Sequence, residues 1–158
     1  MRAVLDSNVL ARAVYSAGGP AEEVVRRLTA PPHVLILSEF LLQELRRVLR
    51  YPRLRRAHGL DDQEIERAVT VLESAAARVE MREEDVIRVV PHDPDDDRVV
   101  ACAVAAGADV LCTRNRHLYH EAVVSRCRQD GIEVMDDVEL LVRLRKMAGE
   151  AGLPRGDA

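Results

Sequence analysis

Arg2-Ala-Val-Leu-Asp6-Ser-Asn-Val-Leu10 is the stretch from which the fold can be argued. Residues 3–5 are a short apolar run typical of a buried strand in a parallel sheet, and residues 9–14 continue with helical spacing. Asp6 stands where the strand stops and the helix begins. Because ligands of open α/β sheets bind beyond the carboxyl ends of strands, Asp6 and Ser7 are either helix caps or members of a binding site.

Strands and helices alternate along the rest of the chain. Apolar runs predict further strands at 34–37, 108–113 and 132–135, with weaker extended segments at 79–81 and 86–90. Helical spacing and capping residues predict helices at 20–30, 38–50, 61–77, 97–104, 117–130 and 136–147. This alternation predicts an α/β fold, a three-layer α/β/α arrangement around a central, mainly parallel sheet.

Length and composition favour a globular protein. With 158 residues and 47% hydrophobic content, we expect one domain over residues 1–147 and a polar tail over 148–158. No apolar run approaches the ~20 residues of a membrane span, and the first residues lack the apolar core of a signal peptide, so a cytoplasmic protein is expected. Cys102, Cys112 and Cys127 lack zinc-site spacing and are expected to be buried thiols.

The charge pattern is uneven. A net charge of −4 argues against bulk attraction of nucleic acid, although it leaves local patches possible. Six arginines crowd residues 46–56, as either a solvated helix end or a phosphate-contacting ridge. With no Trp and one Phe, the chain has little material for the stacking sheets of single-strand binding modules.

Acidic residues occur where a solvated surface does not explain them. Glu44 borders the apolar stripe formed by Leu41, Leu45 and Val48, so its carboxylate needs either an arginine partner or another cation. Residues 93–97 hold four carboxylates in a five-residue window. Helix capping accounts for one or two of them, and the remainder repel one another unless a cation is present.

A parallel sheet would bring several of these side chains to one edge. Asp6, Thr113 and Asn115 follow strands, and the helix that bears Glu44 follows another. Mg²⁺ and Mn²⁺ prefer carboxylate oxygens and retain waters, which suits a site that also holds a phosphate. The five histidines are scattered without zinc-hydrolase spacing.

In their order and spacing, four segments resemble the PIN-domain family: residues 4–10, 38–49, 93–97 and 108–115. The similarity covers residues 2–144 and is greatest to the branch of toxins from toxin–antitoxin modules. It implies an endoribonuclease that cleaves RNA phosphodiesters with Mg²⁺ or Mn²⁺. The implied metal ligands are Asp6, Glu44 and one of Asp96 or Asp97, with Ser7 and Thr113 as polar neighbours. It also implies a homodimer and an antitoxin partner.

One position departs from the family pattern. Asn115 stands where the family usually has an aspartate, which leaves open a one-metal enzyme or a non-catalytic module that binds RNA or protein. The alternative is that Asn115 only caps the following helix. Arg114, Arg116 or the arginines after Glu44 are expected to position the RNA backbone. Receiver domains and haloacid-dehalogenase phosphatases are disfavoured, because each needs a second acid near the first strand, where this chain has Asp6-Ser-Asn8.

Overall fold

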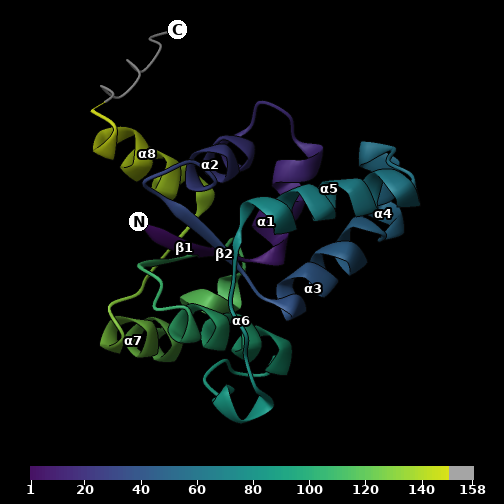
Figure 1. The fold of residues 1–158 in the computed structure, drawn as a ribbon. Coiled ribbons are helices and arrows are strands. Elements are labelled where there is room, and N and C mark those ends of the chain that lie inside the picture. The colour runs from purple at the N-terminus through teal and green to yellow at the C-terminus, as the bar shows by residue number, and fades with distance from the viewer. Residues whose placement is uncertain (150–158) are drawn as a thin grey trace, which may run out of the picture.

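A single parallel sheet forms the centre of the molecule, which a computed structural model describes over residues 1–149 (Figure 1). Its strands are β1 (Arg2–Leu5), β2 (Val34–Leu37), β3 (Ala77–Arg78), β4 (Val110–Cys112) and β5 (Glu133–Met135). Their order across the sheet is β3-β2-β1-β4-β5, and every neighbouring pair is parallel. Most of the tail expected at 148–158 lies outside the described residues.

Helices cover both faces of this sheet. They are α1 (Ser7–Tyr15), α2 (Pro20–Leu28), α3 (Glu39–Leu49), α4 (Pro52–His58), α5 (Asp62–Ala75), α6 (Pro94–Ala105), α7 (Glu121–Gln129) and α8 (Asp137–Met147). Helix α1 packs against α2 and α3, and α8 packs against α2, whereas α6 and α7 lie together on the other side (Figure 1). The expected three-layer α/β/α arrangement is therefore confirmed.

Local sequence signals explain most helix starts. The Ser38 side chain accepts a hydrogen bond from the Leu41 N–H at 3.3 Å, and capping boxes open α5 and α8. The three cysteines are free and buried, as expected. Burial raises the pKa of Cys102 to about 11, which keeps this thiol protonated. Within residues 1–149, no helix has both the length and the apolar character that a membrane crossing requires.

Several expected boundaries are wrong. Strand β3 lies at 77–78 and not at 79–81, and residues 86–90 form no strand. Helix α4 is not among the predicted elements. Proline commonly ends a helix, but here Pro52 is the first residue of a new one, where a missing backbone N–H has no cost. The helix expected at 117–130 divides at His120 into a 3₁₀ turn, η2 (Arg116–Tyr119), and α7.

The strand register fixes where the polar residues emerge. Leu5 of β1 pairs with Cys112 of β4, and the Asp6 N–H donates to the Cys112 carbonyl at 2.9 Å. On the other side of β1, Val4 pairs with Ile36 of β2. The carboxyl ends of β1, β2 and β4 therefore meet at one edge of the sheet, where the first turns of α1 and α3 also begin.

Candidate active site

A pocket of about 180 Å³ opens at this edge of the sheet. The residues that line it come from the turn after β1, from α1, α3 and α6, and from the segment after β4: Asp6, Ser7, Asn8, Phe40, Glu44, Asp95, Asp96, Val99 and Asn115. Four of them are acidic and none is basic. Five of the residues singled out from the sequence thus share one space, and they come from four separate parts of the chain.

Asp6 is the most constrained of these acids. Its Oδ2 accepts hydrogen bonds from the Thr113 hydroxyl at 2.7 Å and from the Asn8 amide at 3.1 Å, while its Oδ1 accepts from the Ser7 N–H at 2.7 Å. Burial raises the pKa of the Asp6 carboxyl, an effect that these hydrogen bonds oppose and the nearby Glu44 carboxylate reinforces. Asp6 therefore caps α1 and also faces the pocket, so both roles considered for it are present.

Glu44 reaches the pocket from the second turn of α3. Its Oε1 forms an ion pair with the Arg47 Nη2 at 2.5 Å, and only 18% of its side chain is exposed. An arginine partner was one of the two expectations for this carboxylate. Because Arg47 is 55% exposed and does not line the pocket, the pair leaves the pocket itself without a basic group.

Asp96 and Asn115 make a direct contact across the pocket. The Asn115 Nδ2 donates to the Asp96 Oδ2 at 2.7 Å, and the Asn115 Oδ1 accepts from the His117 N–H at 3.1 Å. Burial raises the pKa of Asp96 to about 6, with Asp93 and Asp6 adding to the rise and the Asn115 amide opposing it. One side chain thus caps η2 with its oxygen and touches an acid of the pocket with its nitrogen.

Asp97 faces away from the pocket. Its Oδ1 accepts hydrogen bonds from the backbone N–H groups of Val89 and Val90, both at 2.7 Å. These bonds tie the segment before α6 to the helix itself, which also explains why residues 86–90 pair with no strand. Of the two acids that spacing alone did not separate, only Asp96 borders the pocket.

These two hydrogen bonds predict that Asp97 contributes to the stability of the fold. Asp97→Ala is expected to lower the free energy of unfolding by about 1–3 kcal/mol, because two buried or half-buried N–H groups lose their acceptor. Asp97→Asn keeps an oxygen acceptor and serves as the matched control. Thermal unfolding in EDTA measures both variants, and an Asp97→Ala protein as stable as the parent would contradict the assignment.

A second group of possible metal ligands shares Asp96. One ligand atom each from Asp93, Asp96 and His117 lies within 4.8 Å of the others. The His117 Nδ1 is 3.5 Å from the Asp96 Oδ2 and 3.9 Å from the Asp93 Oδ2. Since carboxylate and imidazole are common metal ligands, the arrangement can hold a divalent cation beside the acidic pocket.

The remaining predicted residues surround the site with different roles. Thr113 is completely buried and serves Asp6. The Arg114 Nε donates to the Asp137 Oδ1 at 2.5 Å, so this arginine is tied to a buried acid at the start of α8. Arg116 is exposed and lines a neighbouring recess of about 390 Å³. In the arginine-rich segment after Glu44, the Arg50 Nη2 pairs with Glu66 at 2.6 Å.

The raised pKa of Asp96 predicts a pH dependence. The ordinary pKa of an aspartate is 3.8, and that of Asp96 in the native state is about 6. At pH values between these two, the Asp96 carboxyl keeps its proton in the native state and loses it in the unfolded chain. This contribution to the stability of the metal-free protein is therefore complete below the lower value and is lost as pH rises through about 6. Because a metal must displace that proton, Mn²⁺ affinity should fall as pH falls through the same range, with proton release. Calorimetry in buffers of different ionisation enthalpy measures the release, and Asp96→Asn should reduce it.

Sequence reasoning missed two residues that help to form the site. The Asn8 amide donates to Asp6, and its Oδ1 accepts a hydrogen bond from the Arg114 N–H at 3.3 Å. In the sequence, an asparagine in the first turn of a helix does not indicate a site residue. His117 belongs to no recognisable sequence motif, because its partners Asp93 and Asp96 lie about twenty residues earlier at the start of another helix. Only the strand order brings η2 next to the start of α6.

The sequence matches one family description, PIN domain, over residues 2–117. No curated protein matches it. The expected similarity extended to residue 144, whereas the match ends before α7, β5 and α8. PIN domains are generally nucleases that use divalent metals and bind nucleic acids, which agrees with an acidic pocket beside a possible cation site. Because the match spans well over half of the chain, this protein belongs to the PIN-domain family.

Proposed function

We propose that this protein is an Mg²⁺- or Mn²⁺-dependent endoribonuclease that cleaves RNA phosphodiesters. The observation that carries the proposal is a pocket in which Asp6, Glu44 and Asp96 converge with no basic side chain among them. Carboxylate oxygens at this density suit a hard divalent cation, and burial raises the pKa of Asp6 and Asp96 until such a cation compensates their charge. We therefore assign these three acids as catalytic metal ligands, and not Asp97.

The neighbouring residues have supporting roles in this proposal. When bound, the metal supplies an activated water and neutralises charge on the scissile phosphate. Thr113, Asn8 and Ser7 hold the Asp6 carboxylate in one orientation through three hydrogen bonds. Asn115 does the same for Asp96. Such partners matter because the orientation of a ligand affects metal affinity.

A second cation would use the group formed by Asp93, Asp96 and His117. The imidazole favours Mn²⁺ over Mg²⁺, since nitrogen ligands suit the transition metals. Asn115 offers an oxygen without a negative charge, so it contributes less to a second cation than the aspartate that the family usually has there. We assign the contact with the RNA backbone to Arg116, which is exposed next to His117. Arg114 can contribute only the N–H groups that its bond to Asp137 leaves free.

The test of this function is cleavage of a mixed pool of structured and unstructured RNAs. Cleavage should require Mn²⁺ or Mg²⁺ and should stop on chelation. A pool that stays intact at every metal concentration would contradict the proposal and favour the second candidate, a non-catalytic module that binds RNA or protein. Asn115 is the residue that favours this second candidate, because it lowers the negative charge of the site.

A biological role follows from the same family resemblance. We propose a cytoplasmic toxin of a toxin–antitoxin module, active as a homodimer and held inactive by an antitoxin protein. Light scattering across a wide concentration range tests the dimer. Growth arrest on expression, relieved by the product of a neighbouring small reading frame, tests the toxin role. Growth without arrest would leave RNA processing as the role of the nuclease.

A further inference from the structure

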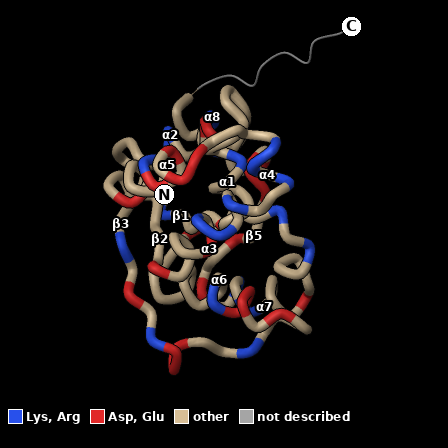
Figure 2. The backbone as a smooth tube through the Cα atoms, turned by 90° about the vertical axis from the view of Figure 1, so that its right-hand side faces the viewer, with Lys and Arg blue, Asp and Glu red and all other residues tan. Residues whose placement is uncertain are grey.

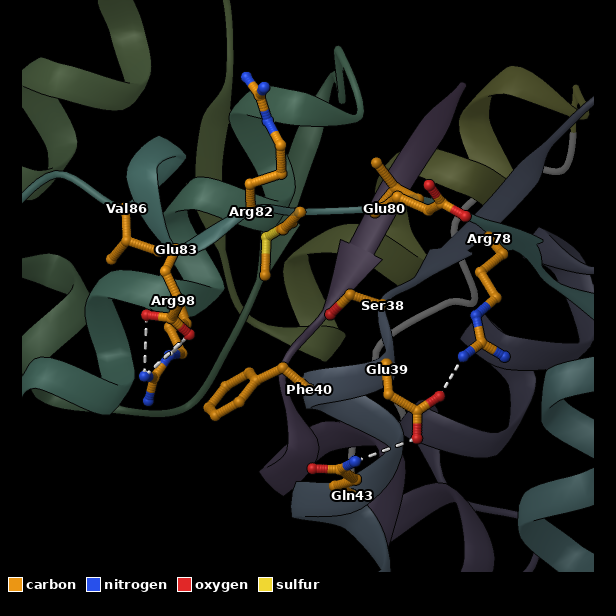
Figure 3. A pocket seen from close by; sticks show the side chains of 12 residues that line it. Ser38, Glu39, Phe40, Gln43, Arg78, Glu80, Arg82, Glu83, Val86 and Arg98 are labelled. Atoms are coloured by element: carbon orange, nitrogen blue, oxygen red, sulfur yellow. Dashed lines mark hydrogen bonds and ion pairs between the residues drawn. The ribbon is translucent and has the colours of Figure 1, made fainter.

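A groove of about 680 Å³ adjoins the acidic pocket. It lies between the first turn of α3, the segment 78–86 and α6 (Figure 3). Phe40 lines both the groove and the acidic pocket, so the two spaces share a wall. The groove has the size of protein sites that hold small organic groups. An RNA strand with one phosphodiester in the acidic pocket would therefore place a neighbouring nucleotide here.

The shared wall carries a surface suited to a planar group. Phe40 is the only phenylalanine of the chain, which has no tryptophan, and its side chain is only partly buried. The Arg98 Cζ lies 5.5 Å from the centroid of the Phe40 ring, and the two side chains lie together at one end of the groove (Figure 3). Aromatic rings and guanidinium planes are the surfaces on which unpaired bases stack.

The groove arginines can contact phosphates at little energetic cost, because all their ion pairs are between side chains at least one-third exposed. These pairs include Arg98 with Glu83 at 3.0 Å, Arg78 with Glu39 and Glu73, and Arg82 with Glu84 and Asp85. Exposed ion pairs of this kind contribute about 0–1 kcal/mol, so a phosphate can replace the carboxylate. Acids and arginines alternate along the segment between β3 and α6 (Figure 2). The net charge of the groove therefore attracts RNA only weakly, and base stacking has to supply much of the affinity for RNA.

We propose that this groove binds one unpaired nucleotide next to the scissile phosphodiester. Its base stacks against Phe40 and Arg98, and Arg78 and Arg82 contact the flanking phosphates. The proposal rests on the ribonuclease function proposed above and adds how the substrate is recognised. Stacking requires an exposed base face, so a nucleotide paired within a duplex does not fit. The three guanidinium groups of the groove can make forked hydrogen bonds to phosphate oxygens once their exposed carboxylate partners are displaced.

Binding can be separated from cleavage by placing each change in an Asp6→Asn protein. Fluorescence anisotropy with a single-stranded RNA and Mn²⁺ gives the dissociation constant. Phe40→Leu is expected to weaken binding about 5- to 100-fold, the usual effect of losing one stacked base. Phe40→Tyr keeps the ring and should bind like the parent. Tyr51→Leu, an exposed aromatic at the far end of α3, is the control and should change nothing.

RNAs with a single abasic position identify the stacked nucleotide. In the protein that keeps Phe40, one abasic position should weaken RNA binding by the same factor as Phe40→Leu does. In the Phe40→Leu protein the same abasic position should have no further effect, because the base and the ring form a single interaction. Thermal unfolding of Phe40→Leu verifies that the fold is intact, and Arg98→Gln provides a second variant on the surface.

The outcomes separate the two proposals. The nucleotide site would be overturned if Phe40→Leu binds every RNA, intact or abasic, as tightly as the protein that keeps Phe40. The groove would then be left to a protein partner. A parent protein that cleaves nothing while its RNA binding still depends on Phe40 would overturn the nuclease and keep this site. If no RNA binds at all, both proposals fail.

Discussion

Asp6→Asn is expected to lower RNA cleavage more than about 100-fold, because substitutions of groups that merely support a metal ligand already cost 10–100-fold. The same change should raise the melting temperature of the metal-free protein or leave it unchanged. Asp6 is 4% exposed, and its pKa is raised because burial disfavours the charged form. Asparagine removes that charge and keeps an oxygen that can accept from Thr113. Activity and apo stability should therefore move in different directions.

Cleavage assays and melting curves in EDTA and in Mn²⁺ measure both effects. Asp109→Asn is a suitable control, since this aspartate precedes β4 at the opposite edge of the sheet and accepts from the Arg2 N–H at 2.7 Å. The control should cleave RNA like the parent protein. Full activity in Asp6→Asn would remove Asp6 from the catalytic site, and a collapse of stability in EDTA would assign it a structural role alone.

Asn115→Asp is expected to have the second-largest effect, with a sign that depends on metal. In EDTA the variant should melt about 5 °C lower, because a carboxylate replaces the amide that donates to Asp96 at 2.7 Å and repels it instead. With Mn²⁺ the added charge should strengthen binding on the order of tenfold, which stabilises the native state by mass action. RNA cleavage at limiting metal should rise accordingly.

The cap of η2 does not confound this comparison. The Asn115 Oδ1 accepts from the His117 N–H, and an aspartate oxygen can accept the same bond. Asn115→Ala removes both the cap and the contact with Asp96, so it should lose stability without any gain in metal response. Melting curves across a Mn²⁺ titration decide the question. Parallel responses of the parent and Asn115→Asp would mean that position 115 does not reach the cation.

The sheet could be predicted because its signals are local. Apolar runs identify β1, β2, β4 and β5, and residues such as Ser38 and Asp136 cap helices through contacts within one turn. The convergence of Asp6, Glu44 and Asn115 could be expected from the parallel arrangement, since parallel strands end at the same edge. Asp96 follows no strand, and it was singled out by the density of acids at 93–97 and by the family resemblance.

What could not be predicted depends on contacts between distant elements. Asp96 and Asp97 are neighbours with the same side chain, and only the path of residues 86–90 gives one of them to the pocket and the other to two backbone N–H groups. The sequence predicts an Arg114 that is free to bind phosphate, but the start of α8 places Asp137 beside it. Strand β3 has two residues, too few for an alternating pattern to be recognised.

The hydrogen bond between Thr113 and Asp6 joins residues that are 107 positions apart. A ribosome adding about 5–20 residues per second needs on the order of ten seconds to make the chain between them. During most of that interval β1 can pair with β2 while β4 and the acids of α6 are still absent from its other side. The acidic pocket cannot exist until Asn115 has been made. A partner that recognises the nascent first layer of helices would therefore meet this protein before its acidic pocket exists.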